Sequence, residues 1–166
     1  MRAASARVSE SAKHRKMLEV LGQFRILFKS VRRHYGEVQR RAGIGGAQLW
    51  ALSHIAGHPG IKPGELAHTM AIHPSTASNL LRDLGKLAFI TKRRQRKDQR
   101  AVQLWATSKG LQILKRAPRP LIGVLQQALS DSSLSDLKVL HRQLDRLVAT
   151  MKAKDTGARS IPLSNL

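Results

Sequence analysis

The spacing of apolar residues changes from helical to strand-like within one stretch of the chain, residues 65–110. Residues 65–70 and then the residues after Pro74 carry apolar side chains three and four apart, which is typical of two short helices. Pro74 suits the first position of the second helix, because proline lacks the N–H that a helix leaves unbonded there. Apolar residues further on recur at every second position, as in a strand: Val102, Leu104 and Ala106. Two helices, a tight turn between them and a following hairpin predict a winged helix-turn-helix.

The predicted second helix has a polar side opposite its apolar side. Short hydroxyl and amide side chains and one guanidinium group can reach base edges in a major groove, and the first turns of a recognition helix make such contacts. A helix side that is only solvated remains the alternative interpretation. The candidate base-contacting residues are Ser75, Thr76, Ser78, Asn79 and Arg82.

A basic run, residues 92–100, lies between the two apolar segments of the predicted hairpin. Six of its nine residues are basic: Lys92, Arg93, Arg94, Arg96, Lys97 and Arg100. A basic hairpin tip suits contacts to phosphates, and an arginine there can enter a minor groove. Asp98 can orient a neighbouring arginine through a charge-assisted hydrogen bond, or it can simply initiate the turn.

Three segments resemble the multiple antibiotic resistance regulator (MarR) family of winged helix-turn-helix transcription factors: PGIKPGELAHTMAIHPSTASNLLRDLGKL, DQRAV and TSKG. The resemblance implies that Arg100 is the minor-groove arginine and that Asp98 supports it. It also implies a homodimer that responds to small aromatic acids bound between the DNA-binding and dimerisation parts. The chain departs from the family pattern at four positions. Asn79 and Lys92 replace frequent arginines, Ala88 replaces a usual glycine, and Ala106 replaces a leucine.

The expected fold is mainly α with a small β-hairpin wing and long terminal helices that dimerise. We expect a mobile tail over 1–13, a single domain over 14–154 and a C-terminal tail over 155–166. Within the domain, 47–107 is the winged helix part, and 14–43 and 108–154 form the dimerisation helices. The long first helix carries an apolar stripe, which fits either a core or half of a dimer interface: Met17, Leu21, Phe24, Phe28, Val31, Tyr35, Val38 and Ala42.

Two further patterns concern the C-terminal part of the chain. Pro118 and Pro120 must kink or break the helix that Thr107 caps, because proline removes a backbone donor and clashes with the preceding turn. A second apolar stripe follows at helical spacing: Leu137, Leu140, Leu144, Leu147 and Met151. Two apolar helices at the chain ends favour a dimer, because a monomer would leave much of this surface exposed.

The charge balance points to a polyanionic partner. The 166 residues include 30 Lys and Arg against 10 Asp and Glu, a net charge of +20. DNA or an anionic membrane surface could supply the opposite charge. No apolar run approaches the ~20 residues that span a bilayer, and no secretory signal precedes the domain, so we expect a cytoplasmic protein. The absence of cysteine excludes disulfides and thiolate metal sites.

The sequence contains few features that indicate an enzyme or a metal site. No phosphate-binding glycine loop, carboxylate pair or nucleophile with a placed base is recognisable, so we predict a protein that is not an enzyme and needs no cofactor. His54 and His58 are four residues apart, and His68 and His73 are near in sequence, so a metal site is conceivable. Exposed or hydrogen-bonded histidines are the favoured interpretation.

These features predict a homodimer that binds a pseudo-palindromic double-stranded DNA operator and acts as a ligand-responsive repressor. The alternative is a sequence-tolerant architectural or nucleic-acid-coating protein, which the charge of +20 supports directly. A basic adaptor that binds protein or RNA through the same fold is a third possibility. The ratio of affinities for specific and random duplexes separates the first two.

Overall fold

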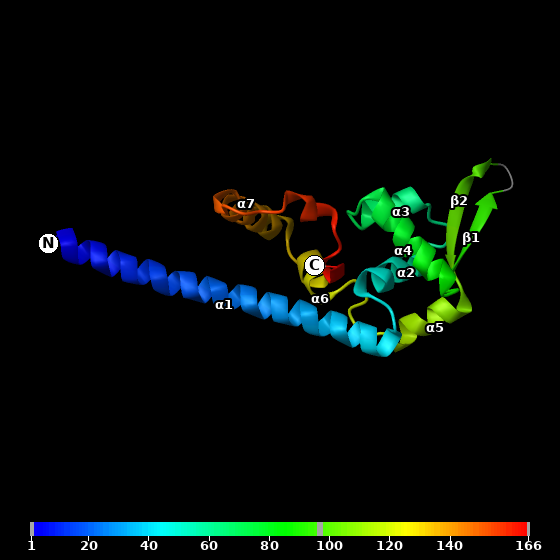
Figure 1. Ribbon diagram of the computed structural model, residues 1–166, viewed down its shortest axis with the longest axis horizontal. Helices are drawn as coiled ribbons and strands as arrows, with labels where there is room; N and C mark the ends of the chain where they lie inside the picture. The colour runs from blue at the N-terminus through cyan, green and yellow to red at the C-terminus, as the bar shows by residue number, and fades with distance from the viewer. Residues whose placement is uncertain (1, 96–97, 166) are drawn as a thin grey trace.

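The computed structural model describes residues 2–95 and 98–165 and consists mostly of helices with one two-stranded antiparallel sheet (Figure 1). The expected mainly α architecture with a small β-hairpin is confirmed. No helix in these two ranges is long and apolar enough to cross a bilayer.

The first helix, α1, spans Arg2–Ala42 and projects as a long arm beyond the rest of the molecule (Figure 1). We expected a tail over residues 1–13, but the helix already begins at Arg2. The reason is compositional, because this segment is rich in alanine, arginine and lysine and contains neither glycine nor proline. The arm ends at Gly43, whose φ of +68° suits a residue without a side chain.

The winged helix is built around one apolar core. It consists of α2 Gly46–Gly57, α3 Pro63–Thr69, α4 Pro74–Lys86, β1 Ile90–Gln95 and β2 Asp98–Ala106. The two strands pair antiparallel, with Ile90 opposite Ala106 and Lys92 opposite Leu104. Fully buried aliphatic side chains from these elements and α1 fill the core: Val38, Leu49, Leu52, Ile55, Leu66, Leu81, Leu84 and Leu104.

The arm and the winged helix meet where α1 passes the start of α2. A side chain on Gly46 would overlap the ring of Tyr35, and it would lie 3.1 Å from Ser164 Cβ. Glycine at the start of α2 therefore permits the close approach that fixes α2 against α1.

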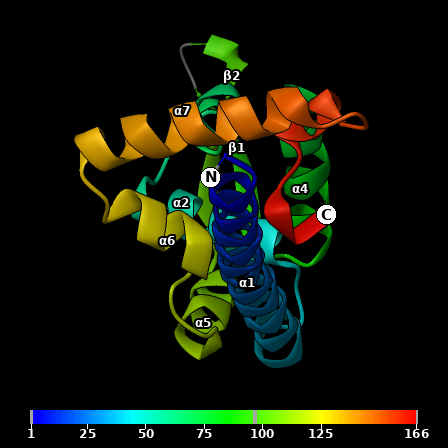
Figure 2. The same cartoon turned by 90° about the vertical axis from the view of Figure 1, so that its left-hand side faces the viewer.

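The C-terminal part contains α5 Ser108–Arg116, α6 Val124–Ser130 and α7 Leu134–Thr150. Thr107 caps α5 as predicted, since its hydroxyl accepts a hydrogen bond from the Gly110 N–H at 3.1 Å. The helix does not continue with a kink through Pro118 and Pro120. It breaks at Arg116, and residues 117–123 lead to α6, which starts after Gly123 at a φ of +101°. Figure 2 shows α7 lying crosswise to α1.

The last residues pack onto the body of the protein, although we expected a tail over 155–166. Two short 3₁₀ helices form here, η1 Thr156–Ser160 and η2 Leu163–Asn165. Pro162 is buried, and the Ser164 hydroxyl accepts a hydrogen bond from the Ala47 N–H at 3.0 Å. The end of the chain thus accepts the hydrogen bond from a backbone donor at the start of α2. No local sequence pattern predicts this contact.

Candidate nucleic-acid interface

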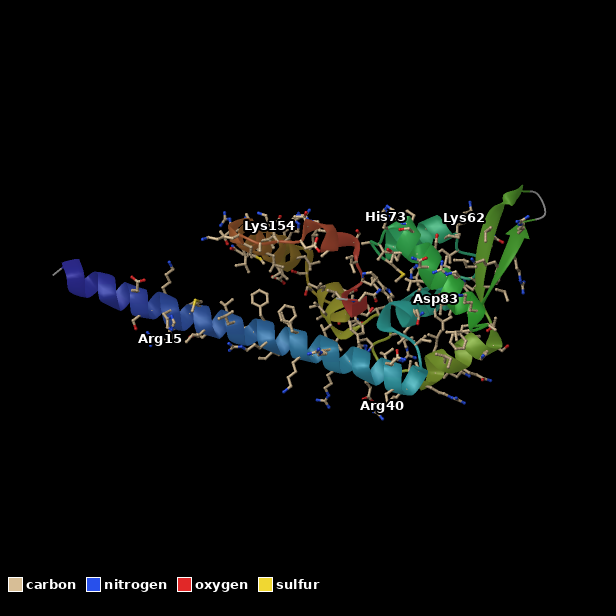
Figure 3. All side chains as sticks on the ribbon, in the orientation of Figure 1. Arg15, Arg40, Lys62, His73, Asp83 and Lys154 are labelled. Atoms are coloured by element: carbon tan, nitrogen blue, oxygen red, sulfur yellow. The ribbon has the colours of Figure 1, made fainter. Side chains whose placement is uncertain are left out.

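The pair α3 and α4 presents one polar side to solvent. The apolar side of α4 is buried through Ala77, Leu80, Leu81 and Leu84. Four of the five predicted contact residues are exposed on the opposite side: Ser75, Ser78, Asn79 and Arg82. Ala71, at a φ of +51°, makes the tight turn between the two helices. Figure 3 shows His73 and Lys62 on the same side of the molecule as the wing, where α3, α4 and the hairpin come together.

Two of the serine hydroxyls on α4 already have protein partners. His73 precedes α4, and its Nδ1 accepts a hydrogen bond from the Ser75 N–H at 3.3 Å and lies 2.7 Å from Ser75 Oγ. The Ser78 hydroxyl donates to the Pro74 carbonyl at 2.9 Å. Both hydroxyl oxygens keep acceptor capacity.

The longer side chains of α4 are less constrained. Arg82 is exposed, with only a loose approach of its Nε to Asp83 Oδ1 at 3.8 Å. Asn79 is also exposed, and its amide carries both donors and an acceptor. Asn79 and Arg82 are therefore the residues of this helix best able to read base edges.

Thr76 differs from the other four predicted residues. It is half-buried on the flank of α4, because it is offset by ~100° around the helix from Ser75. Together with Asn79 and Asp83 it lines a hollow of about 420 Å³, which the C-terminal residues Ile161, Pro162 and Asn165 also line. Its position is thus next to the docked chain end and not on the outward polar side.

The described basic residues of the wing divide between its two faces. Side chains alternate along a strand, so Lys92 and Arg94 share the face of buried Ile90 and Leu104. Arg93 lies on the other face, where its guanidinium carbon is 5.1 Å from the centre of the Trp105 ring. Such a cation–π contact holds Arg93 against the wing. Lys92 and Arg94 are the basic pair turned toward the helix side of the hairpin.

Four predicted wing residues cannot be placed in full. Arg96 and Lys97 lie outside the described residues. Asp98 and Arg100 belong to β2, where Asp98 is paired with Gln95, but their side chains lie outside the described set. The supporting contact between Asp98 and Arg100 stays a prediction.

A family model for the MarR family matches residues 42–101, the part that contains α2, α3, α4 and most of the hairpin. Over these residues the winged helix-turn-helix of this chain is similar to that of the MarR family. The resemblance predicted from the sequence is confirmed, and the MarR family consists of transcription regulators that bind DNA.

Solved structures show the same fold at low sequence identity. FabT of Streptococcus pneumoniae in complex with DNA is 18% identical, with a TM-score of 0.55, over 81% of this chain and 94% of that chain. YusO of Bacillus subtilis is 20% identical, with a TM-score of 0.54, over 83% and 98%. A mutant of MarR from E. coli with operator DNA is 17% identical, with a TM-score of 0.51, over 78% and 96%. No curated protein matches the chain in sequence.

One departure from the family pattern lies in the turn before the wing. Ala88, at the usual glycine position, has a φ of +58°. An L-residue is disfavoured in this left-handed region, whereas glycine is not. The turn at Ala88 therefore carries a cost in conformational strain.

Two residues of this MarR-type interface were not among the predicted site residues. Trp105 holds Arg93, and His73 caps the recognition helix and bonds to Ser75. Strand alternation could have indicated Trp105, since it belongs to the same face as Arg93. No capping rule based on Ser, Thr, Asp or Asn would have selected His73.

Two of the four histidines considered as metal ligands, His58 and His73, hydrogen-bond within the protein. The rings of His54 and His58 stack with centroids 4.3 Å apart, and His58 Nδ1 lies 3.1 Å from the His54 carbonyl oxygen. Burial, followed by the nearby charge of His58, lowers the pKa of His54. Among the described residues no group of three or more histidines and carboxylates comes together as a metal site would require.

Proposed function

We propose that the chain is a sequence-specific, double-stranded-DNA-binding transcription regulator that acts as a homodimer. The observation that carries this proposal is the polar side of α4 beside the basic wing. Asn79 and Arg82 would contact base edges in the major groove, and Ser75 and Ser78 would add shorter contacts. Lys92 and Arg94 would bind the adjacent backbone, and Arg100 would enter the minor groove.

Exposed apolar surface on α1 and α7 supports the homodimer. Phe28 is 71% exposed and Met17 is 47% exposed, although both belong to the apolar stripe of α1. The apolar stripe of α7 is exposed at Leu140, Leu144, Leu147, Val148 and Met151. Apolar faces of this extent are uncommon on a monomer. A two-fold dimer would place two copies of α4 on half-sites about one helical turn, ~34 Å, apart.

A cavity between the arm and the C-terminal part supports control by a small acidic ligand. It measures about 470 Å³ and has mostly apolar walls from Leu27, Phe28, Val31, Leu125 and Leu163, with Tyr35 and Arg32 among its lining residues. An aromatic ring would pack on the apolar walls, and Arg32 would pair with a carboxylate. Because the cavity joins the arm to α6 and η2, a ligand there would bias the spacing of the two recognition helices, as a ligand-responsive repressor requires.

A sequence-tolerant coating protein is the competing function. The net charge of +20 exceeds what one specific site needs, and nonspecific phosphate contacts scale with such charge. The polar outward side of α4 favours the specific regulator, because a coating protein needs no groups that read bases.

A random-pool selection tests the proposal. Purified protein is used to select duplexes over several rounds, and the bound stoichiometry is then measured. The proposed function predicts a pseudo-palindromic consensus bound by two chains. A pool that gains no consensus contradicts sequence-specific recognition, and one chain per duplex contradicts the homodimer.

A further inference from the structure

Positive charge is concentrated on the arm as well as on the wing. Helix α1 contains eleven Lys and Arg residues but only three acids, Glu10, Glu19 and Glu37. The seventeen residues between the last two acids include four basic side chains and no acid. Neither the recognition helix nor the wing accounts for this charge.

Five exposed basic side chains of α1 form what we call the basic ridge: Arg15, Arg25, Lys29, Arg33 and Arg40. Arg25, Lys29 and Arg33 follow each other at four-residue spacing, so they are neighbours on the helix surface. Arg33 is eighteen residues, or about five turns, from Arg15 and therefore points the same way. The ridge extends ~38 Å along the axis, at about 1.5 Å per residue.

The ridge faces away from the proposed DNA interface. Figure 3 shows Arg15 and Arg40 on the side of α1 opposite α7, α3 and the wing. The apolar stripe that we assign to the dimer lies on another side of the helix. Phe24 and Phe28 each precede a ridge residue by one position, and a helix turns by ~100° per residue. A dimer formed through the apolar stripe would therefore leave the ridge open, and a straight duplex on α4 would not reach it.

Within the part of the chain that the structure describes, the central charges of the ridge have no ion-pair partner. Glu37 pairs with Arg40 and Arg41 at 2.8 and 2.5 Å, and Glu19 pairs with Lys16. None of the ion pairs found among residues 2–95 and 98–165 includes Arg25, Lys29 or Arg33. Like charges four residues apart destabilise a helix, so a polyanion along this row would relieve their repulsion.

We infer that the basic ridge is a second binding surface for double-stranded DNA, which lets one dimer hold two duplexes. A duplex carries one negative charge per ~1.7 Å of axis, so a row of cations ~6 Å apart, on a ridge about as long as one turn of DNA, lies within reach of several phosphates. Contacts from lysine and arginine to phosphates carry no sequence information, so the ridge binds without sequence preference. The inference rests on the proposed function only in that the first duplex occupies α4 and the wing.

Helix α5 packs against α1, and its Lys115 and Arg116 are exposed. Basic residues on two packed helices suit an extended polyanion better than a small anion.

A two-duplex capture assay tests the inference. A selected duplex is immobilised in excess and loaded with protein, and a labelled duplex of random sequence is then added. The test variant combines Arg25→Gln, Lys29→Gln and Arg33→Gln, which keep helix propensity. The matched control combines Lys138→Gln, Arg142→Gln and Arg146→Gln, which remove the same charge at the same spacing from exposed positions on α7. Circular dichroism checks that both variants fold.

The parent and the α7 control should retain the second duplex, whereas the ridge variant should retain at least tenfold less. Its affinity for the first duplex should change by less than twofold. Equal loss in both variants would show that net charge alone matters and would overturn the inference, as would a parent that binds one duplex but never two. Ridge-dependent binding to anionic vesicles in place of DNA would overturn it too.

Single-duplex titrations separate this inference from the proposed function. Arg94→Gln should weaken binding to the first duplex. Protein molecules that still bind the first duplex should capture the second duplex as the parent does. If Arg94→Gln leaves the first duplex bound as in the parent, and the ridge variant loses only the second duplex, the wing assignment fails and the ridge stands. If the parent binds no duplex at all, both fail.

Discussion

Gly110 packs so closely on Phe89 that a side-chain carbon at position 110 would overlap the Phe89 carbonyl oxygen. The neighbouring Thr107 strengthens the same junction, because its hydroxyl donates to the Ala88 carbonyl at 2.7 Å and its N–H donates to the Phe89 carbonyl at 2.9 Å. Residues 107–110 therefore fix the start of α5 against the residues that precede β1. The hairpin can keep this position only if residue 110 has no side chain.

Gly110→Ala should destabilise the protein by roughly 1–3 kcal/mol, the usual cost of overpacking. Chemical denaturation measures the change. Gly85→Ala in α4 is the control, because nothing lies within 4 Å of the added carbon there, and alanine should stabilise that helix by up to about 1 kcal/mol. Equal stability of Gly110→Ala and the parent would contradict the close packing.

Ala88→Gly should stabilise the fold slightly. Relief of a left-handed L-residue is worth about 1–2 kcal/mol, and the added freedom of glycine in the unfolded chain removes roughly 0.4–1 kcal/mol of this gain. The expected net gain is therefore small, roughly 0–1.6 kcal/mol, and is measured by thermal and chemical denaturation. A loss of stability would show that Ala88 is not strained in solution.

The two faces of the wing should respond differently to neutralisation. Arg94→Ala should weaken binding to any duplex and reduce the slope of log affinity against log salt by ~0.9, the value for one phosphate contact. Arg93→Ala should leave that slope nearly unchanged, because its guanidinium is held on Trp105. Fluorescence anisotropy over a salt series measures both. If Arg93→Ala reduced the salt slope and Arg94→Ala did not, Arg93 and not Arg94 would be the DNA contact.

The recognition helix should read bases through Asn79 and not through Thr76. Asn79→Ala should cost ~1–3 kcal/mol on the selected duplex and relax preference at one base pair. Thr76→Ala should have a much smaller effect, because Thr76 is half-buried whereas Asn79 is exposed. Titration of single-base variants of the duplex measures this, and a Thr76 effect as large as that of Asn79 would count against the orientation of α4.

Acid should destabilise the fold through His34. Burial lowers the pKa of His34 below its ordinary 6.5, against smaller opposing effects of the Pro120 carbonyl and Glu37. The unfolded chain therefore takes up a proton first, and stability is lost as the pH falls below about 6.5 toward the folded pKa, by at most about 1.4 kcal/mol per pH unit. Denaturation at pH 7.5 and 5.5 should show a weaker pH dependence of stability for His34→Gln than for the parent. The lowered pKa of His54 preserves part of the dependence.

Local sequence patterns were sufficient to predict the winged helix. The helical spacing around Leu80 and Leu84, Pro74 at the start of α4, and Thr107 as a cap each predicted the structure correctly, because each depends on residues within one or two turns. The interruption after α5 was predicted from Pro118 and Pro120, which must kink or break a helix.

Contacts between distant segments were not predictable in the same way. Docking of the chain end depends on the hydrogen bond between Ala47 and Ser164, which are 117 residues apart. The position of Thr76 depends on that docking, and the position of Arg93 depends on a tryptophan from the other strand. The helical start at Arg2 was missed for a different reason, because serine-rich composition was given more weight than the absence of glycine and proline.

Fluorescence-anisotropy titration at physiological salt tests the central claim most directly. Labelled DNA from upstream of the chain's own coding region, or the duplex recovered by selection, is compared with a shuffled duplex of equal composition. A specific regulator should prefer the first by at least a hundredfold, and typically ~10³-fold, at two chains per site. Equal affinity for the selected and shuffled duplexes would contradict the account and identify a sequence-tolerant coating protein instead.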